Sequence, residues 1–125
     1  MTENEKKTIE IEEMVKNIEE KITNNEYYED VTIEYKDCNL HCRLRPISQA
    51  KFVKITNDRK KMESAEFNTL VVAEGLINKY DNKPFKKSQI EELFDGGLVS
   101  LLAIKIMEMS GITQSAEQMK KLQNF

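Results

Sequence analysis

The sequence has no tryptophan, only two prolines, four glycines and two cysteines, and a single histidine. Two cysteines are too few for a disulfide framework, which favours a reducing compartment such as the cytoplasm. No apolar run approaches the roughly 18 residues of a membrane-spanning helix. The first residues also lack the apolar core of a secretion signal. The scarcity of proline and glycine favours helices joined by few tight turns.

What the chain does contain is charge, nearly balanced in sign. Charged residues make up 33% of its 125 residues, and the formal net charge is −3. This balance argues against a nucleic-acid-binding protein, which presents a basic face. It also gives no polybasic segment for an anionic membrane. The length suits one domain, and the 39% hydrophobic content supports a modest core in the middle and C-terminal thirds of the chain.

An amphipathic helix is predicted from Thr8 to about Asn24 and Asn25. Its apolar residues recur at helical spacing and form a narrow stripe, with charged residues on the opposite face. The stripe consists of Ile11, Met14, Val15, Ile18 and Ile22. A stripe this narrow leaves two alternatives: the helix packs on its own domain, which we favour, or it pairs with a partner helix.

A β-hairpin is predicted next, because two segments alternate apolar and polar residues around Lys36-Asp37. The strands run from Val31 to Tyr35 and from Cys38 to Leu44, and Pro46 closes the second strand. Strand alternation places Cys38 and Cys42 on one face and His41 on the other. This arrangement, together with the lack of a second Cys or His pair, argues against zinc and favours buried structural cysteines.

The remainder of the chain is predicted to be helical. Ser48 is expected to cap a short helix, and a second, more buried helix carries Phe67 through Ile77. A polar connection, Tyr80 to Pro84, leads to a helix capped by Ser88 and Glu91. Gly96-Gly97 breaks the chain before a central apolar helix, residues 98–109, and Gly111 fits the left-handed position just after its end.

These segments predict an α+β fold, mostly helical, with a small antiparallel hairpin packed against a bundle of about four to five short helices. Residues 1–7 are expected to be disordered. Residues 8–112 are expected to form a single globular domain of N-terminal helix, hairpin and helical core. Residues 113–125 are expected to form either a last helix or a tail that becomes ordered on binding.

No set of residues typical of catalysis, a metal or a cofactor is recognisable. The paired carboxylates lie in polar surroundings, so raised pKa values for acid–base chemistry are not indicated. The lone His41 stands beside Cys42 in a strand, where neighbouring side chains diverge. Asp95-Gly96-Gly97 has neither form of phosphate-loop spacing. The sequence therefore predicts a non-enzymatic protein without catalytic residues, metal or cofactor.

The order of the segments resembles the tail assembly chaperones of long-tailed phages, in particular the XkdN-like group. In both, a strand ending in alternating basic and apolar residues precedes a helix that begins Ser-x-x-x-aromatic. A helix with a Leu-Val-Val-Ala-x-Gly run follows, and an apolar helix then ends at Ser-Gly-aliphatic. The matching residues here are Cys42 to Gln49, Phe52, Phe67 to Ile77, and Leu98 to Ile112. The resemblance covers roughly residues 30 to 112.

The resemblance implies a phage or prophage protein that acts in the host cell cytoplasm and is not expected in the mature virion. It would bind and solubilise the long helical tape-measure protein before the tail tube polymerises, with the tail tube protein as a further candidate partner. Self-association into a homo-oligomer is also expected, and partners such as nucleic acid or membrane are not. Alternative functions are a small structural tail or head–tail connector protein, or a small intracellular dimeric regulator.

Candidate partner-binding residues lie at the C-terminal end of the chain. The candidates in the apolar helix can contact a partner only if part of that helix is exposed. The alternative is that the helix belongs to the core and the C-terminal tail is simply disordered. The candidates are Leu98, Leu101, Leu102, Ile106, Met119, Leu122 and Phe125.

Overall fold

A computed structural model describes residues 7–58 and 64–112. Within these residues the chain forms five helices and a four-stranded sheet, which confirms the predicted α+β, mostly helical fold. The helices are α1 (Ile11–Thr23), α2 (Gln49–Asp58), α3 (Ser64–Gly75), α4 (Lys87–Leu93) and α5 (Gly96–Met109). The strands are β1 (Glu29–Tyr35), β2 (Cys38–Leu44), β3 (Leu76–Asn78) and β4 (Lys83–Pro84). The predictions for residues 1–6 and 113–125 lie outside the described residues.

The sheet is antiparallel throughout, in the order β1-β2-β3-β4. The predicted hairpin is present as β1 and β2, with Val31 opposite Cys42 and Tyr35 opposite Cys38. Lys36 has a positive φ of 56° in its two-residue turn. Such a backbone angle suits the tight turns that connect right-twisted strands.

The second half of the sheet differs from the prediction. Leu76 and Ile77 were expected to continue a helix, but they form β3 and pair with Leu44 and Arg43 of β2. The connection expected at Tyr80 to Pro84 contains β4 at its end. Pro84 is tolerated there because β4 is the edge strand of the sheet.

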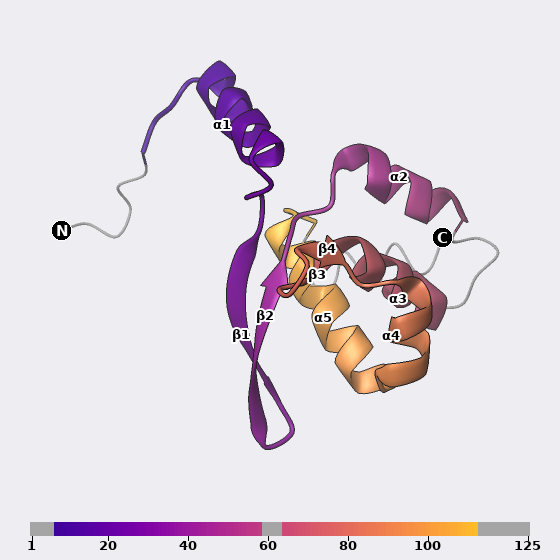
Figure 1. Ribbon diagram of the computed structural model, residues 1–125. Helices are drawn as coiled ribbons and strands as arrows, with labels where there is room; N and C mark the ends of the chain where they lie inside the picture. Colours follow the sequence, from indigo (N-terminus) through magenta and orange to yellow (C-terminus); the bar gives the residue numbers. More distant parts are fainter. Residues whose placement is uncertain (1–6, 59–63, 113–125) are drawn as a thin grey trace.

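The core lies where α3 packs against α4 and α5, and it also includes buried side chains of β2 and β3. Its fully buried side chains come from four of these elements: Leu44, Val71, Val72, Ile90, Leu102, Ala103 and Ile106. Burying one such aliphatic side chain contributes roughly 1.5–3 kcal/mol, so this cluster is the main source of stability. Figure 1 shows α2 to α5 gathered to one side of the β1–β2 ribbon, whereas α1 stands apart.

Local signals set most of the helix boundaries. Ser48 Oγ accepts a hydrogen bond from the Lys51 backbone N–H at 3.2 Å, as expected for the cap of α2. After α5, Gly111 has a φ of +74°, and its N–H and that of Ile112 bond back to Glu108 and Met107. This is the glycine-dependent Schellman arrangement that ends helices.

Two predicted helix starts are wrong. The expected capping box at Ser88 and Glu91 is displaced by two residues, because the Lys86 backbone N–H donates to Gln89 Oε1 at 2.9 Å. The expected break at Gly96-Gly97 is instead the first turn of α5. Asp95 caps that turn by accepting from the Leu98 backbone N–H at 2.9 Å.

Candidate protein-binding site

The apolar residues of α1 lie on the surface of the molecule. We call Ile11, Met14, Val15, Ile18 and Ile22 the α1 stripe. Four of its members are between 43% and 65% exposed, Ile18 is half-buried, and α1 contains no buried residue. The favoured prediction of packing on the domain is therefore wrong for this helix, and the partner-helix alternative stays open.

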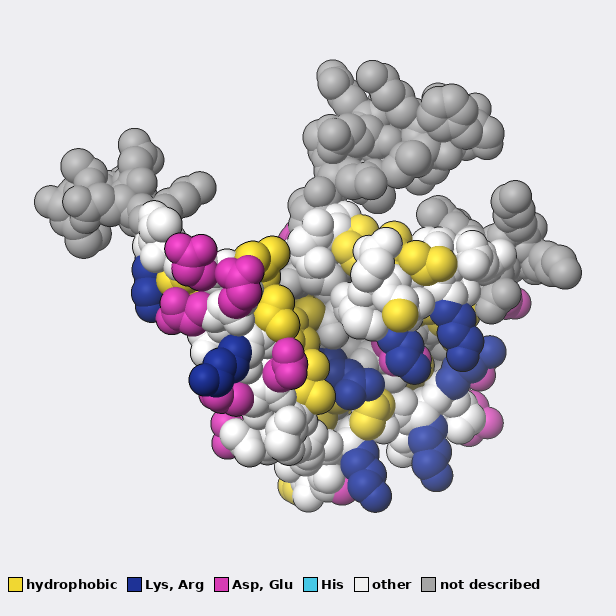
Figure 2. Space-filling view, turned by 90° about the horizontal axis from the view of Figure 1, so that it is seen from above, with side chains coloured by type: hydrophobic (Ala, Val, Ile, Leu, Met, Phe, Trp, Pro, Cys, Tyr) yellow, Lys and Arg dark blue, Asp and Glu magenta, His cyan; other side chains and the backbone are white. Residues whose placement is uncertain are grey.

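The α1 stripe differs from the scattered apolar side chains that any protein surface carries. Its members are contiguous along a helix of 13 residues, about 20 Å long. Figure 2 shows a band of hydrophobic side chains over this part of the molecule, next to acidic side chains. Contiguous apolar patches rimmed by polar residues mark sites of interaction with other molecules. The α1 stripe is thus the leading candidate site.

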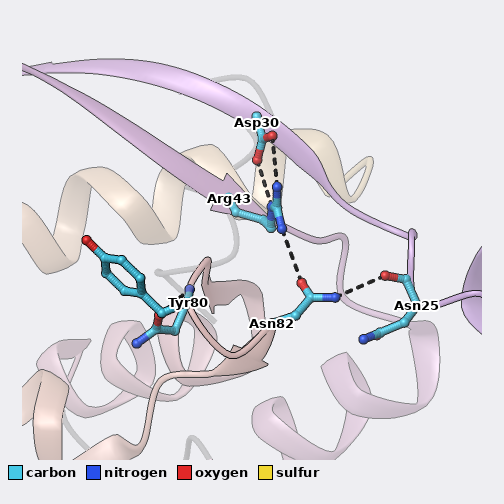
Figure 3. A network of polar contacts seen from close by, with 6 residues as sticks. Asn25, Asp30, Arg43, Tyr80 and Asn82 are labelled. Carbon is cyan, nitrogen blue, oxygen red and sulfur yellow. Dashed lines mark hydrogen bonds and ion pairs between the residues drawn. The ribbon is translucent and has the colours of Figure 1, made fainter.

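A network of polar contacts, shown in Figure 3, holds residues 24–28, which follow α1 and which we call the base of α1. Asn25 follows the helix with a φ of 58°, and its carbonyl accepts a hydrogen bond from Asn82 Nδ2 at 3.2 Å. Asn82 Oδ1 in turn accepts from Arg43 at 3.4 Å. The network joins the end of α1, the β2 strand and the turn between β3 and β4. It therefore constrains where α1 leaves the domain.

Arg43 is the centre of this network. Its guanidinium donates to both carboxylate oxygens of Asp30, at 2.9 and 3.2 Å, and lies 4.0 Å from the centre of the Tyr28 ring. The hydrogen bonds from Arg43 lower the pKa of Asp30, and the same contact raises the pKa of Arg43. Asp30 and Arg43 face each other in the hairpin register, so this pair could have been found from the predicted hairpin. No pattern in the sequence indicated that Asn82 and Tyr28 would contact Arg43.

A small cavity of about 90 Å³ opens at the base of α1, beside the C-terminal end of the α1 stripe. About three water molecules would occupy that volume. Its walls come from α1, the segment before β1, the β2–α2 connection, β3 and the β3–β4 turn: Ile22, Asn25, Tyr27, Tyr28, Arg45, Ile77 and Asn82. Because Ile22 belongs to both features, the cavity and the stripe form one continuous surface.

The C-terminal residues expected to contact a partner have different positions. Leu102 and Ile106 are buried, 2% and 0% exposed, in the core between α3 and α5. In this fold a partner has no access to them. Leu98 and Leu101 are half-buried and pack against the same core. Met119, Leu122 and Phe125 lie outside the described residues.

The cysteines and the histidine do not converge. Cys38 is exposed, which corrects the prediction that both cysteines are buried, and Cys42 is half-buried. Burial raises the pKa of the Cys42 thiol, so thiolate formation is disfavoured. His41 lies on the other face, 3.0 Å from the Thr32 hydroxyl. Within residues 7–58 and 64–112, no group of three His, Cys, Asp or Glu side chains is placed to hold a metal ion.

A search of the described helices finds none that is long and apolar enough to cross a membrane. Comparison of the chain with protein-family models, curated proteins and solved structures gives no match.

Proposed function

We propose that this protein is a non-catalytic binding protein whose contact surface is the α1 stripe. More specifically, we propose that it is a phage or prophage tail assembly chaperone whose client is the tape-measure protein. The observation that supports a binding role is the exposure of the α1 stripe on a helix without buried residues. The choice of client rests on the resemblance of residues 30 to 112 to tail assembly chaperones.

The proposed role gives a physical reason for an apolar stripe that lies exposed along one helix. A long helical client that is not yet assembled exposes hydrophobic surface and aggregates unless that surface is covered. A chaperone that must later be released is best bound through many weak contacts, because each chaperone copy can then dissociate from the client separately. One stripe of five residues offers a small contact of this kind. The net charge of −3 contributes to keeping the complex in solution.

Co-expression with the tape-measure protein of the same gene neighbourhood tests the proposal. We expect a soluble complex of high mass by size-exclusion chromatography with light scattering. The double variant Val15→Glu/Ile22→Glu should abolish it, since it places two charges on the exposed stripe. The matched control, Asn17→Glu/Thr23→Glu, adds the same two charges to exposed positions beside the stripe and should keep the complex.

Two outcomes would reject the proposed function. One is the absence of any complex or gain in client solubility with the unmodified chain. The other is a complex that is unaffected by Val15→Glu/Ile22→Glu. Presence of the chain in purified particles would favour a structural tail or connector protein instead.

A dimeric regulator is the second candidate, because an exposed apolar helix can also pair with its own copy. In that case the chain alone would have the mass of a dimer. The variant Val15→Glu/Ile22→Glu would then convert it to a monomer without any client present.

A further inference from the structure

We propose that the α1 stripe binds an amphipathic helix whose apolar seam is flanked by lysine or arginine. This inference rests on the proposed role of α1 as the client-binding surface, and it adds the chemistry of the client segment. Three features of α1 carry it: the spacing of the stripe, the distribution of charge beside it, and the absence of ion pairs between its carboxylates and other residues of the described ranges, 7–58 and 64–112.

The spacing of the stripe is that of a helix–helix seam. Four of its members, which we call the seam, are separated by four, three and four residues: Ile11, Val15, Ile18 and Ile22. Core positions in a coiled coil alternate in the same way. The α1 backbone is a regular helix across all four residues. A partner helix can therefore place its own apolar residues between them over about two heptads. An extended peptide has a period of two and would match this spacing poorly.

Charge beside the seam is mainly acidic. Glu12 and Glu19 each follow a seam residue directly and lie along one edge of it, while Met14 and Lys21 lie along the other edge. Including the capping residue, α1 carries five glutamates and two lysines: Glu10, Glu12, Glu13, Glu19 and Glu20 against Lys16 and Lys21. Figure 2 shows acidic side chains along the hydrophobic band. An oppositely charged partner fits this edge.

These carboxylates have no competing partner inside the described part of the protein. The ion pairs found in residues 7–58 and 64–112 involve other carboxylates, on β1, α3, α5 and the residue before α5. All five glutamates are exposed. Pairing with a basic partner therefore breaks no ion pair in that part of the chain, and complementary charge along a rim sets specificity and orientation.

A second copy of this chain would match the spacing of the seam, but its charges would not complement the glutamates beside the seam. In an antiparallel pair the same edges meet, so Glu12 of one copy would lie opposite Glu19 of the other. In a parallel pair Glu19 would lie opposite Met14 of the other copy and find no cation. Neither arrangement uses the acidic edge. A basic-flanked helix from another protein is thus the better occupant.

Two synthetic helical peptides of about 21 residues, three heptads each, test the inference on the full chain. Both carry the same leucine and isoleucine seam, with lysine flanks in one peptide and glutamate flanks in the other. Titration calorimetry at about 50 mM and about 300 mM salt spans the range in which exposed charges are screened. We expect the lysine peptide to bind at least tenfold more tightly at low salt, and its advantage to shrink at high salt.

Matched variants locate the effect on the helix. Glu12→Gln/Glu19→Gln removes two charges at the edge of the seam and should weaken the lysine peptide by roughly 3- to 10-fold, as expected for two exposed ion pairs. Glu13→Gln/Glu20→Gln removes two charges from the opposite side of α1 and should change affinity less than about twofold, since those carboxylates lie far from the partner. Val15→Glu/Ile22→Glu should abolish binding of both peptides.

Equal affinity for the two peptides would overturn the inference, as would equal effects of the two glutamine pairs. The proposed function can fail separately. If the tape-measure protein forms no complex while the lysine peptide binds as described, the client is wrong and the chemistry of the α1 site stands. If the tape-measure complex forms but ignores Glu12→Gln/Glu19→Gln, the chaperone role stands and the basic-helix inference is wrong.

Discussion

At the scale of single residues, the contact between α3 and α5 depends on a glycine. A Cβ atom added to Gly75 would lie 2.6 to 2.9 Å from three side-chain atoms of Ile106. Ile106 is fully buried, and because protein interiors are close-packed its side chain has little room to shift. We therefore predict that Gly75→Ala lowers the free energy of unfolding by about 1–3 kcal/mol, the usual cost of overpacking. Urea denaturation followed by circular dichroism measures it.

Gly96 provides the control for this substitution. It lies in the first turn of α5, and a Cβ there would meet no atom within 4 Å. Gly96→Ala should leave stability unchanged or raise it by up to about 1 kcal/mol, because alanine restricts the unfolded chain. Equal stability of Gly75→Ala and Gly96→Ala would show that α3 and α5 can separate at no cost.

A second residue-scale effect concerns Asp95, which joins the hairpin turn to α5. Its carboxylate accepts hydrogen bonds from the Tyr35 hydroxyl and the Leu98 backbone N–H, and it pairs with Lys36 at 3.3 Å. The Tyr35 hydrogen bond, followed by that from Leu98, lowers the pKa of Asp95 below its usual 3.8. The folded state therefore binds a proton here less readily than the unfolded chain does.

The lowered pKa of Asp95 determines how the stability of the protein changes with pH. A carboxylate with a lowered folded pKa stabilises the protein above its unfolded pKa, and that contribution is lost as pH falls through the folded value. We predict that the urea midpoint drops as pH is lowered from about 5 to about 3, and that Asp95→Asn reduces this drop. Asparagine keeps a helix cap without the charge. The control Glu91→Gln, at an exposed position, should keep the drop; a drop unchanged in Asp95→Asn would exclude Asp95 as its source.

At the scale of elements, the network around Arg43 should determine how firmly the base of α1 is held. Asn82→Gly removes the amide that joins Arg43 to the Asn25 carbonyl, while glycine still tolerates the positive φ of 57°. We predict faster hydrogen–deuterium exchange in residues 24–28 and unchanged exchange in α5. The network is peripheral to the core, so only local opening becomes easier.

Lys36→Gly is the matched control, because it makes the same kind of change at another positive φ, 56°, in the β1–β2 turn. In Lys36→Gly, faster hydrogen–deuterium exchange should be limited to residues near the hairpin turn. If Asn82→Gly and Lys36→Gly loosen residues 24–28 equally, the Asn82 contact does not hold the base of α1.

The elements also show what local sequence can predict. The hairpin was predicted correctly because alternation and the Lys36-Asp37 turn fix its register without reference to the rest of the chain. Leu76 and Ile77 were assigned to a helix because they continue an apolar run without interruption. They form a strand because the edge of β2 is available to pair with them, and that information is not local.

The same limit applies to the candidate site. The periodicity of the α1 stripe predicted a helix with one apolar face, and the structure contains that helix. Whether the face is covered depends on where the rest of the chain packs, which periodicity does not report. The apolar helix at residues 98–109 was likewise predicted correctly as central, and for this reason Leu102 and Ile106 lie in the core.

At the scale of the whole molecule, burial is distributed unevenly. The buried side chains connect the hairpin and the β2–α2 connection with α2 to α5, and α1 contributes none of them. A helix of 13 residues with no buried side chain gains little from tertiary packing and is marginally stable in water. Stability should therefore fall from the core outward to α1, with α1 opening independently of the remainder.

This uneven burial leads to a prediction for the free and bound protein. Amides of α1 should exchange with deuterium orders of magnitude faster than those of α5, which should exchange only by global unfolding. Adding the lysine-flanked peptide should slow exchange in α1 and leave α5 unchanged, because binding covers the stripe without altering the core. Exchange measured by mass spectrometry at two protein concentrations separates the alternatives. If α1 were already as protected as α5 in dilute free protein, the stripe would be packed within the chain. If its protection rose with protein concentration alone, a second copy would be the natural occupant of the stripe.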